Sequence, residues 1–211
     1  MTKLLVVDDH AIVRSGIRRL LAARHDMEIS EAKSGEEALA LVRETAFQLI
    51  ILDLNLPGLG GLELLRRILK SGPRQRVLVF SLHAEPIYAT RAMEAGARGF
   101  ISKNAAPEEL LAAIETILEG GTVMERDIAA EITTHEAGDT AFLRSLTQRD
   151  LEILRLLAQG NNLAQIAETL GVAYKTIANT LSRIKEKLGV SHTADLIRIA
   201  IGRGLTDLSS N

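Results

Sequence analysis

The chain contains no cysteine and no tryptophan, and only four phenylalanines and two tyrosines. Without cysteine, neither a disulfide framework nor a metal site built on thiolates is possible. This absence suits the reducing conditions of a cytosol. Hydrophobic residues make up 46% of the sequence, so the 211 residues can bury a core as one large domain or as two small ones.

Long apolar runs are also missing. The N-terminus reaches Asp8 and Asp9 after only four consecutive apolar residues, and no later stretch is long and uncharged enough for a signal peptide or a membrane span. We therefore expect a soluble protein of the cytoplasm that has no membrane as a partner.

Charge of one sign does not dominate the chain, whose net charge is −2, but the charge is unevenly distributed. Residues 1–120 carry 15 Lys and Arg against 16 Asp and Glu, and residues 121–143 carry one Arg against five acids. Residues 144–211 carry nine Lys and Arg against six acids. A basic segment behind an acidic one indicates a polyanion as a partner of the last segment.

The first 120 residues alternate between short apolar runs and amphipathic helical patterns. Five runs are predicted to be strands: Lys3–Val7, Met27–Lys33, Leu49–Asp53, Val77–Ser81 and Gly99–Ser102. The third and fourth are almost continuously apolar, as are central strands of a parallel sheet covered on both faces. Strands that alternate with helices predict an open, doubly wound α/β domain with a five-stranded parallel sheet.

Turn and capping signals mark the helices between these strands. Ser34 and Glu37 have the spacing of a capping box at the start of a helix. Pro57–Gly61 is predicted to be a loop, and Pro86 and Pro107 fit the first turns of two further helices.

The alternation stops after Gly120. Residues 121–143 are polar and acidic and are predicted to be a linker, with a short helix over Asp127–Ile132 inside it. Residues 144–211 are predicted to be a small all-α domain. Its four helices are expected over Thr147–Gln159, Leu163–Leu170, Lys175–Leu188 and Thr193–Gly202.

Polar side chains stand at the ends of four predicted strands: Asp8 and Asp9, Asp53, Ser81, and Lys103. Because ligands of an open parallel sheet bind beyond the carboxyl ends of its strands, we expect these residues in one crevice. Three carboxylates there need a cation, and Mg²⁺ is the natural candidate. With a metal beside it and Lys103 opposite, Asp53 can act as a nucleophile toward phosphorus.

Each of these residues has a plainer explanation when it is taken alone. Paired aspartates at a strand end usually cap or turn the chain, a lysine there is usually a surface charge, and Ser81 could satisfy nearby backbone. His10 could be a metal ligand, but a residue that starts a helix is the favoured interpretation. The prediction depends on four strand ends that supply matching chemistry together.

The segments VVDDH, ILDLNLPGLGGLELL, VFSLH and GARGFISK resemble the receiver domain of two-component response regulators, over essentially all of residues 1–120. The resemblance implies a flavodoxin-like fold and Mg²⁺ as the cofactor. It further implies that Asp53 is the phosphoacceptor, and that Asp8, Asp9, Asp53 and the backbone carbonyl of Asn55 bind the metal.

The same resemblance assigns roles to three residues around Asp53. Ser81 and Lys103 are expected to contact the phosphoryl group, and Phe100 occupies the position of the aromatic switch residue. One departure is Asn104, which follows the lysine where many receivers have proline. Regulators with this type of output domain often lack that proline, so the implied function is unaffected.

The segment SLTQRDLEILRLLAQGNNLAQIAETLGVAYKTIANTLSRIKEKLGV resembles the LuxR/FixJ-type (NarL-type) helix-turn-helix, and the resemblance covers residues 146–205. A short helix, a tight turn at Gly171–Ala173 and a longer helix can set the second helix into the major groove. An ordinary helical bundle has the same periodicity, so the family resemblance is what favours DNA. The predicted DNA-contacting residues are Lys175, Thr176, Asn179, Thr180, Ser182, Arg183 and Lys185.

Two residues of the second helix depart from the family pattern. Ala178 stands where a lysine or another polar residue is common, and Thr180 stands where a histidine is common. Loss of a lysine removes one phosphate or guanine contact, which would weaken or redirect DNA binding.

Together the two resemblances imply a transcription factor that is switched by phosphorylation. A histidine kinase or a small phosphodonor phosphorylates Asp53. Ser81 and Phe100 then shift, and the DNA-binding domain is released or forms a homodimer on promoter DNA. Transfer of the phosphoryl group to Asp53 and its later loss are the only enzymatic chemistry expected.

Two other classes of protein share some of these features. Asp53 and Asn55 loosely match the Asp-x-Asp of aspartyl-phosphate phosphatases, but the acidic pair precedes Asp53 and no cap domain follows the sheet. The second class is an interaction module in which Ala178 reflects lost DNA binding. Turnover of phosphate monoesters would favour the first class, and failure to retain DNA at low salt would favour the second.

Overall fold

The computed structural model describes residues 1–22, 24, 26–72, 75–82, 85–125, 128–129, 145–202 and 205. The chain divides into two compact units, Met1–His135 and Glu136–Asn211, and each is described by itself. Within the described parts, none of the helices combines the length and the apolar character that crossing a membrane requires.

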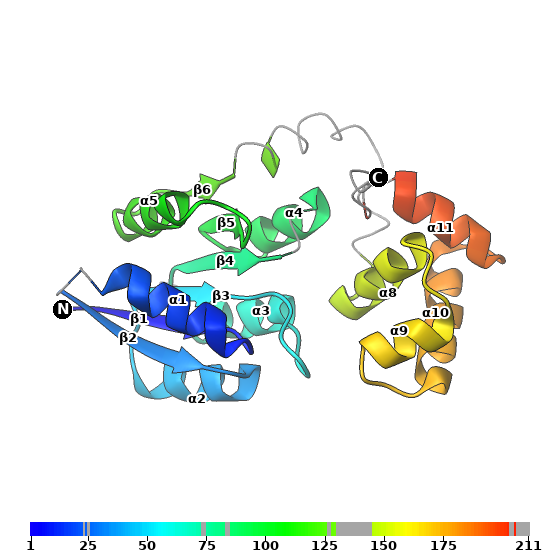
Figure 1. Ribbon diagram of the computed structural model, residues 1–211, viewed down its shortest axis with the longest axis horizontal. Coiled ribbons are helices and arrows are strands. Elements are labelled where there is room, and N and C mark those ends of the chain that lie inside the picture. Colours follow the sequence, from blue (N-terminus) through cyan, green and yellow to red (C-terminus); the bar gives the residue numbers. More distant parts are fainter. Residues whose placement is uncertain are drawn as a thin grey trace. The chain divides into compact units, whose positions relative to one another are not determined.

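The first unit contains a parallel sheet with the strand order β2-β1-β3-β4-β5-β6 (Figure 1). Its strands are β1 (Thr2–Val7), β2 (Met27–Ala32), β3 (Leu49–Leu52), β4 (Val77–Ser81), β5 (Gly99–Ser102) and β6 (Val123–Met124). All five pairs of neighbours are parallel, which confirms the doubly wound fold.

The sixth strand corrects the prediction of five strands. Val123 and Met124 lie in the segment predicted to be a linker, but they pair with Gly99 and Phe100 of β5. Two residues are too few for a recognisable alternation of apolar and polar side chains. They are a strand because their backbone pairs with that of β5, which lies about 24 residues earlier in the sequence.

Five helices connect these strands: α1 (Ala11–Leu21), α2 (Gly35–Glu44), α3 (Gly61–Ser71), α4 (Pro86–Glu94) and α5 (Pro107–Leu118). Pro86 and Pro107 lie in first turns, as predicted. The Ser34 side chain accepts a hydrogen bond from the Glu37 backbone N–H, as in a capping box. The Glu37 carboxylate, however, accepts from the backbone N–H of Lys33 rather than of Ser34.

The strands alternate their side chains between two buried layers. Leu4 and Val6 of β1 face α1 and α5 in one apolar cluster, which also contains Ile17 and Ile114. Leu5 and Val7 point to the opposite face because successive side chains of a strand alternate. Helices α2, α3 and α4 lie on that opposite face (Figure 1). Helices on both faces explain why the central strands are continuously apolar.

The second unit consists of the helices α8 (Gln148–Ala158), α9 (Leu163–Thr169), α10 (Tyr174–Leu188) and α11 (Thr193–Gly202). The first two begin with complete capping boxes, at Thr147 and Asn162. Gly171, with φ +62°, makes the turn between α9 and α10. The helix predicted over Asp127–Ile132 lies outside the described residues apart from Ile128 and Ala129, which are helical.

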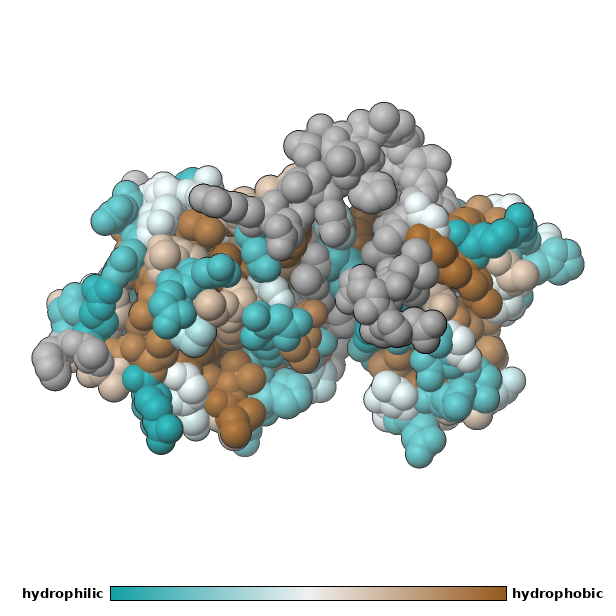
Figure 2. Space-filling view, turned by 45° about the horizontal axis from the view of Figure 1, so that its top comes forward, coloured by the Kyte–Doolittle hydropathy of each residue, from teal (hydrophilic) through white to brown (hydrophobic). Residues whose placement is uncertain are grey.

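The exposed large apolar side chains of the described residues are far apart in sequence: Met1, Ile12, Leu82, Tyr174 and Ile201. In the view of Figure 2, hydrophobic and hydrophilic surface alternate over both units. Single exposed apolar side chains are normal for a protein surface.

Candidate functional site

Three predicted site residues meet at the carboxyl ends of the strands. Asp8 follows β1, Asp53 follows β3 and Lys103 follows β5. The Lys103 Nζ lies 2.6 Å from Asp8 Oδ2 and 2.7 Å from Asp53 Oδ2. The three side chains are at most 7% exposed. The sheet therefore brings together residues that are up to 95 positions apart in the sequence.

Burial sets the electrostatics of this group. Burial raises the pKa of the Asp53 carboxyl group, although the hydrogen bond and the charge of Lys103 act in the opposite direction. Burial also opposes the charge of Lys103, but its hydrogen bonds to Asp53 and Asp8 prevail and raise the pKa of its ammonium group. Because ionised Asp53 is poorly stabilised by the protein alone, an added cation would favour the carboxylate form.

Asp9 and His10 complete an acidic cluster with Asp8 and Asp53. One potential ligand atom of each residue lies within 4.8 Å of those of the others. An oxygen-rich pocket of this kind is typical of Mg²⁺ sites, so the residues present fit that ion. Asp9 is one-third exposed, which leaves an approach to the pocket from solvent.

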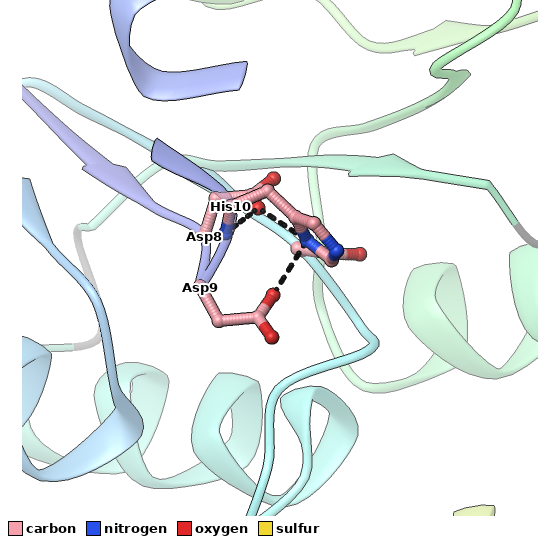
Figure 3. Close-up of side chains that lie close together, drawn as sticks. Asp8, Asp9 and His10 are labelled. Atoms are coloured by element: carbon pink, nitrogen blue, oxygen red, sulfur yellow. Dashed lines mark hydrogen bonds and ion pairs between the residues drawn. The ribbon is translucent and has the colours of Figure 1, made fainter. Parts of the chain in front are cut away.

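His10 lies at the start of a helix, as the favoured interpretation of the sequence predicted. It occupies the N-cap position of α1, but its side chain makes no capping hydrogen bond. Its Nδ1 instead lies 2.8 Å from Asp9 Oδ1 and 3.3 Å from Asp8 Oδ1 (Figure 3). The backbone of His10 thus precedes the helix, while its imidazole lies in the acidic cluster.

Arg14 supports the cluster and was not predicted. Its Nη1 donates to the backbone carbonyl of Asp8 at 2.7 Å, and its Nε donates to Glu31 at 3.0 Å. The arginine therefore ties α1 and β2 to the loop that carries the acidic pair. No spacing in the sequence marks this contact, because it depends on how the helix lies on the sheet.

The remaining receiver residues surround the group. Ser81 is fully buried at the end of β4, and its carbonyl accepts the backbone N–H of Lys103 at 2.8 Å. Phe100 is fully buried in β5. The Asn55 backbone N–H donates to Asp53 Oδ1 at 3.1 Å. Asn55 therefore contacts Asp53, Phe100 lies in the strand that leads to Lys103, and Ser81 lies beside that strand.

Asn104 has a structural role of its own. Its backbone N–H donates to Ser102 Oγ at 3.1 Å. Proline has no N–H and could not make this bond. The departure from the commoner receiver pattern therefore adds a hydrogen bond to the loop that holds Lys103.

In the second unit, α10 presents a polar face. Ile177, Leu181 and Ile184 are buried on its other side. Five of the predicted DNA-contacting residues are exposed and two are half-buried; the half-buried ones are Thr180 and Lys185. The Ser182 hydroxyl donates to the Ala178 carbonyl at 3.1 Å, so it turns back onto its own helix.

Arg183 is held by a buried carboxylate. Its Nη2 lies 2.9 Å from Asp150 Oδ1, and Lys187 Nζ lies 3.0 Å from Asp150 Oδ2. Asp150 also accepts the backbone N–H of Thr147 in the capping box of α8. The Arg183 side chain remains 54% exposed, so this contact fixes its position without covering it.

The chain belongs to the response regulators that join a receiver domain to a LuxR-type helix-turn-helix domain. Residues 4–115 match the response regulator receiver domain, and residues 144–200 match the bacterial regulatory proteins of the luxR family. It is a two-component response regulator, and proteins of this kind bind DNA and regulate transcription.

Curated relatives match over both domains. The transcriptional activator protein ExaE of Pseudomonas putida is 39% identical, over 98% of this chain and 99% of the relative. The response regulator UvrY of Escherichia coli K12 is 33% identical, over 97% of this chain and 96% of the relative. Similarity over nearly the full length of both chains extends to the order of the two domains.

Solved structures agree on the fold. A two-component response regulator of the LuxR family from Aurantimonas sp. SI85-9A1 is 41% identical, covers 65% of this chain and all of its own, and gives a TM-score of 0.62. RcsB of Salmonella enterica serovar Typhimurium, bound to a promoter in the presence of BeF₃⁻, is 24% identical. It covers 93% of this chain and 96% of its own at a TM-score of 0.62, which is a likeness of fold.

Proposed function

We propose that Asp53 accepts a phosphoryl group from a cognate histidine kinase or a small phosphodonor in the cytoplasm, and that this event controls DNA binding. The observation that carries the proposal is the placement of the Asp53 carboxylate 2.7 Å from Lys103 Nζ, within an acidic cluster that fits a divalent cation. A buried carboxylate between two cationic groups is suited to attack phosphorus.

In the transfer, an Asp53 carboxylate oxygen forms the bond to phosphorus, and the bond to the donor's leaving group breaks. Asp8, Asp9, Asp53 and the Asn55 carbonyl would hold Mg²⁺, which neutralises phosphoryl charge when bound. Lys103 already lies at hydrogen-bond distance from Asp53 and would exchange part of that contact for a phosphoryl oxygen. The Ser81 hydroxyl then turns to the phosphoryl group, and Phe100 moves with it.

Helix α10 is the element that would contact DNA when Asp53 is phosphorylated. The residues proposed to contact DNA are Lys175, Thr176, Asn179, Thr180, Ser182, Arg183 and Lys185. They extend along the helix that follows the turn at Gly171, as in a recognition helix that enters the major groove. A phosphorylated homodimer would place two such helices on half-sites about 34 Å apart, one turn of DNA.

The experiment that tests both parts is a pull-down of genomic DNA fragments with the purified full chain. Protein treated with BeF₃⁻ and Mg²⁺, which mimics phosphorylated Asp53, is compared with untreated protein and with Asp53→Asn. We expect a few discrete fragments to be enriched only after treatment and only with wild-type Asp53.

Each other outcome removes one part of the proposal. Equal enrichment with and without BeF₃⁻ keeps DNA binding but removes Asp53 as the switch. The absence of any enrichment, even at low salt, removes DNA binding and points to Ala178 and Thr180 as its cause.

A further inference from the structure

A segment between the two family matches bonds to the loop that carries Lys103, beside the proposed phosphorylation site. The receiver match ends at residue 115 and the luxR match begins at residue 144. Strand β6 lies between them and belongs to the sheet of the first unit, and Glu125 directly follows this strand. We call residues 123–125 the linker clamp.

The linker clamp is attached to β5 along its whole length. The Val123 backbone N–H donates to the Arg98 carbonyl at 3.0 Å, and the Glu125 N–H donates to the Phe100 carbonyl at 3.3 Å. Gly99 allows this close approach, because a Cβ there would lie 3.2 Å from the Val123 carbonyl oxygen and 2.8 Å from Ile117 Cδ1.

Glu125 continues the pairing with its side chain. β6 ends at Met124, so the next N–H of β5, that of Ser102, needs an acceptor that a longer strand would supply from its backbone. The Glu125 carboxylate fills this place, with Oε2 2.8 Å from the Ser102 nitrogen. Ser102 is only 3% exposed, so without Glu125 its N–H would lose its partner in a buried position.

Ser102 immediately precedes Lys103, and three successive backbone N–H groups of this short loop each donate a hydrogen bond. Ser102 donates to Glu125, Lys103 donates to the Ser81 carbonyl, and Asn104 donates to Ser102 Oγ. Two of these three bonds are made within the receiver match, whereas the first comes from the linker. The backbone that positions the Lys103 ammonium group is therefore bonded directly to the start of the linker.

We propose that Glu125 is a positioning residue for the Lys103 loop, and that the linker clamp transmits phosphorylation of Asp53 to the linker through β5. This inference rests on the proposed role of Asp53. When Lys103 exchanges its contact with Asp53 for a phosphoryl oxygen, Ser102 and the carboxylate that binds its N–H move with it. The path uses the backbone of the strand that carries Phe100 and does not require a change of the helices.

Hydrogen exchange of the full chain, measured by mass spectrometry with and without Mg²⁺ and BeF₃⁻, tests the inference. In the wild type, peptides that contain Asp53, residues 99–104 and residues 121–125 should all change their exchange rates on treatment. In Glu125→Ala, we expect exchange over 121–125 to be about tenfold faster before treatment, because the clamp opens more often. In this variant the exchange of residues 121–125 should no longer change on BeF₃⁻ treatment, while the exchange of the Asp53 peptide still changes.

Two control variants separate positioning from general destabilisation. In Glu125→Gln the amide oxygen can accept the hydrogen bond from the same N–H. The exchange rate of residues 121–125 in this variant should therefore stay within about twofold of the wild type. Glu119→Ala removes an exposed carboxylate near the end of α5 and should behave as the wild type. Equal effects of Glu125→Ala and Glu125→Gln would overturn the assigned hydrogen-bond role.

The remaining outcomes distinguish this inference from the proposed function. A response to BeF₃⁻ over 121–125 in Glu125→Ala equal to that of the wild type overturns the inference alone. If the wild-type protein responds to BeF₃⁻ at the Asp53 peptide but not over residues 121–125, the inference alone is likewise overturned. Absence of a response at the Asp53 peptide of the wild type overturns the role of Asp53 and, with it, the inference.

Discussion

Asp150 is a carboxylate with no exposed surface, and it joins the start of α8 to α10. Burial opposes its charge, but hydrogen bonds from Thr147, Arg183 and Lys187 prevail and lower the pKa of its carboxyl group below 3.8. A carboxyl group with a lowered pKa stabilises the fold at pH values above its unfolded pKa, and this contribution is lost as the pH falls through the folded pKa.

We therefore expect Asp150→Asn to reduce the free energy of unfolding of the second unit by about 1–3 kcal/mol at neutral pH. The difference from the wild type should be constant between about pH 5 and pH 7 and should shrink below the unfolded pKa of 3.8. Urea unfolding of the full chain at several pH values measures this difference in the free energy of unfolding.

The surface pair of Asp195 and Arg198 provides the matched control in the same unit. Because the Arg198 side chain is 79% exposed, Asp195→Asn should cost less than about 1 kcal/mol. Equal losses for the two variants would mean that burial of Asp150 contributes nothing to its effect.

At the scale of single elements, two glycines of the first unit should respond to alanine in opposite ways. A Cβ on Gly61, at the start of α3, would lie 2.5 Å from the Asp53 carbonyl oxygen and 2.4 Å from Leu54 Cα. At Gly16, inside α1, such a Cβ would meet no heavy atom within 4 Å apart from the neighbouring residues and the backbone of its own helix. Gly61 is thus required by the close approach of α3 to the end of β3, whereas Gly16 only makes its helix more flexible.

Gly61→Ala should lower the free energy of unfolding by about 1–3 kcal/mol and should also weaken BeF₃⁻ binding, because the loop after β3 must shift. Gly16→Ala should raise it by about 0.5–1 kcal/mol without affecting BeF₃⁻ binding. Both variants report on the same unfolding transition, so denaturant curves compare them directly. A stabilising Gly61→Ala would contradict the close packing at this point.

At the scale of the whole molecule, DNA affinity should depend on the cations of α10. Each lysine that contacts a phosphate contributes about 0.9 to the slope of log affinity against log salt concentration. Lys175 is exposed in the first turn of α10 and is an expected phosphate contact. Lys175→Ala should therefore reduce the magnitude of the slope by about one and weaken binding to different sequences alike.

Lys33→Ala is the matched control, since Lys33 is exposed on the receiver. Its salt slope should equal that of the wild type in titrations with fragments recovered from the genomic pull-down. If Lys175→Ala leaves the slope unchanged, Lys175 does not contact phosphate in the complex.

The position of the acidic pair, Asp53 and Lys103 at strand ends could be predicted from the sequence, because the hydrophobic pattern identifies the strands that they follow. The four helices of the second domain were likewise predicted to within one residue at each end. Their apolar stripes and their Thr and Asn caps are local signals, which need no knowledge of the rest of the chain.

Other features could not be predicted because they depend on contacts between distant residues. β6 is a strand only because β5 lies beside it, and Arg14 and Asp150 acquire their roles only when a helix packs against its neighbour. Glu125 likewise has no local signal that would connect it with Ser102, 23 positions earlier.

The sequence by itself determined the class of fold, the two-domain order and the chemical groups of both candidate sites. The fold class follows from periodicity and from residue types at strand and helix ends, which are properties of short segments. The DNA-contacting residues follow from the family resemblance, because periodicity alone also fits an ordinary helical bundle. The tertiary structure decided which of these groups meet, at what distance and in what degree of burial. It did so because the electrostatics of Asp53 and the bond from the linker to the Lys103 loop depend on neighbours that only the folded sheet brings together.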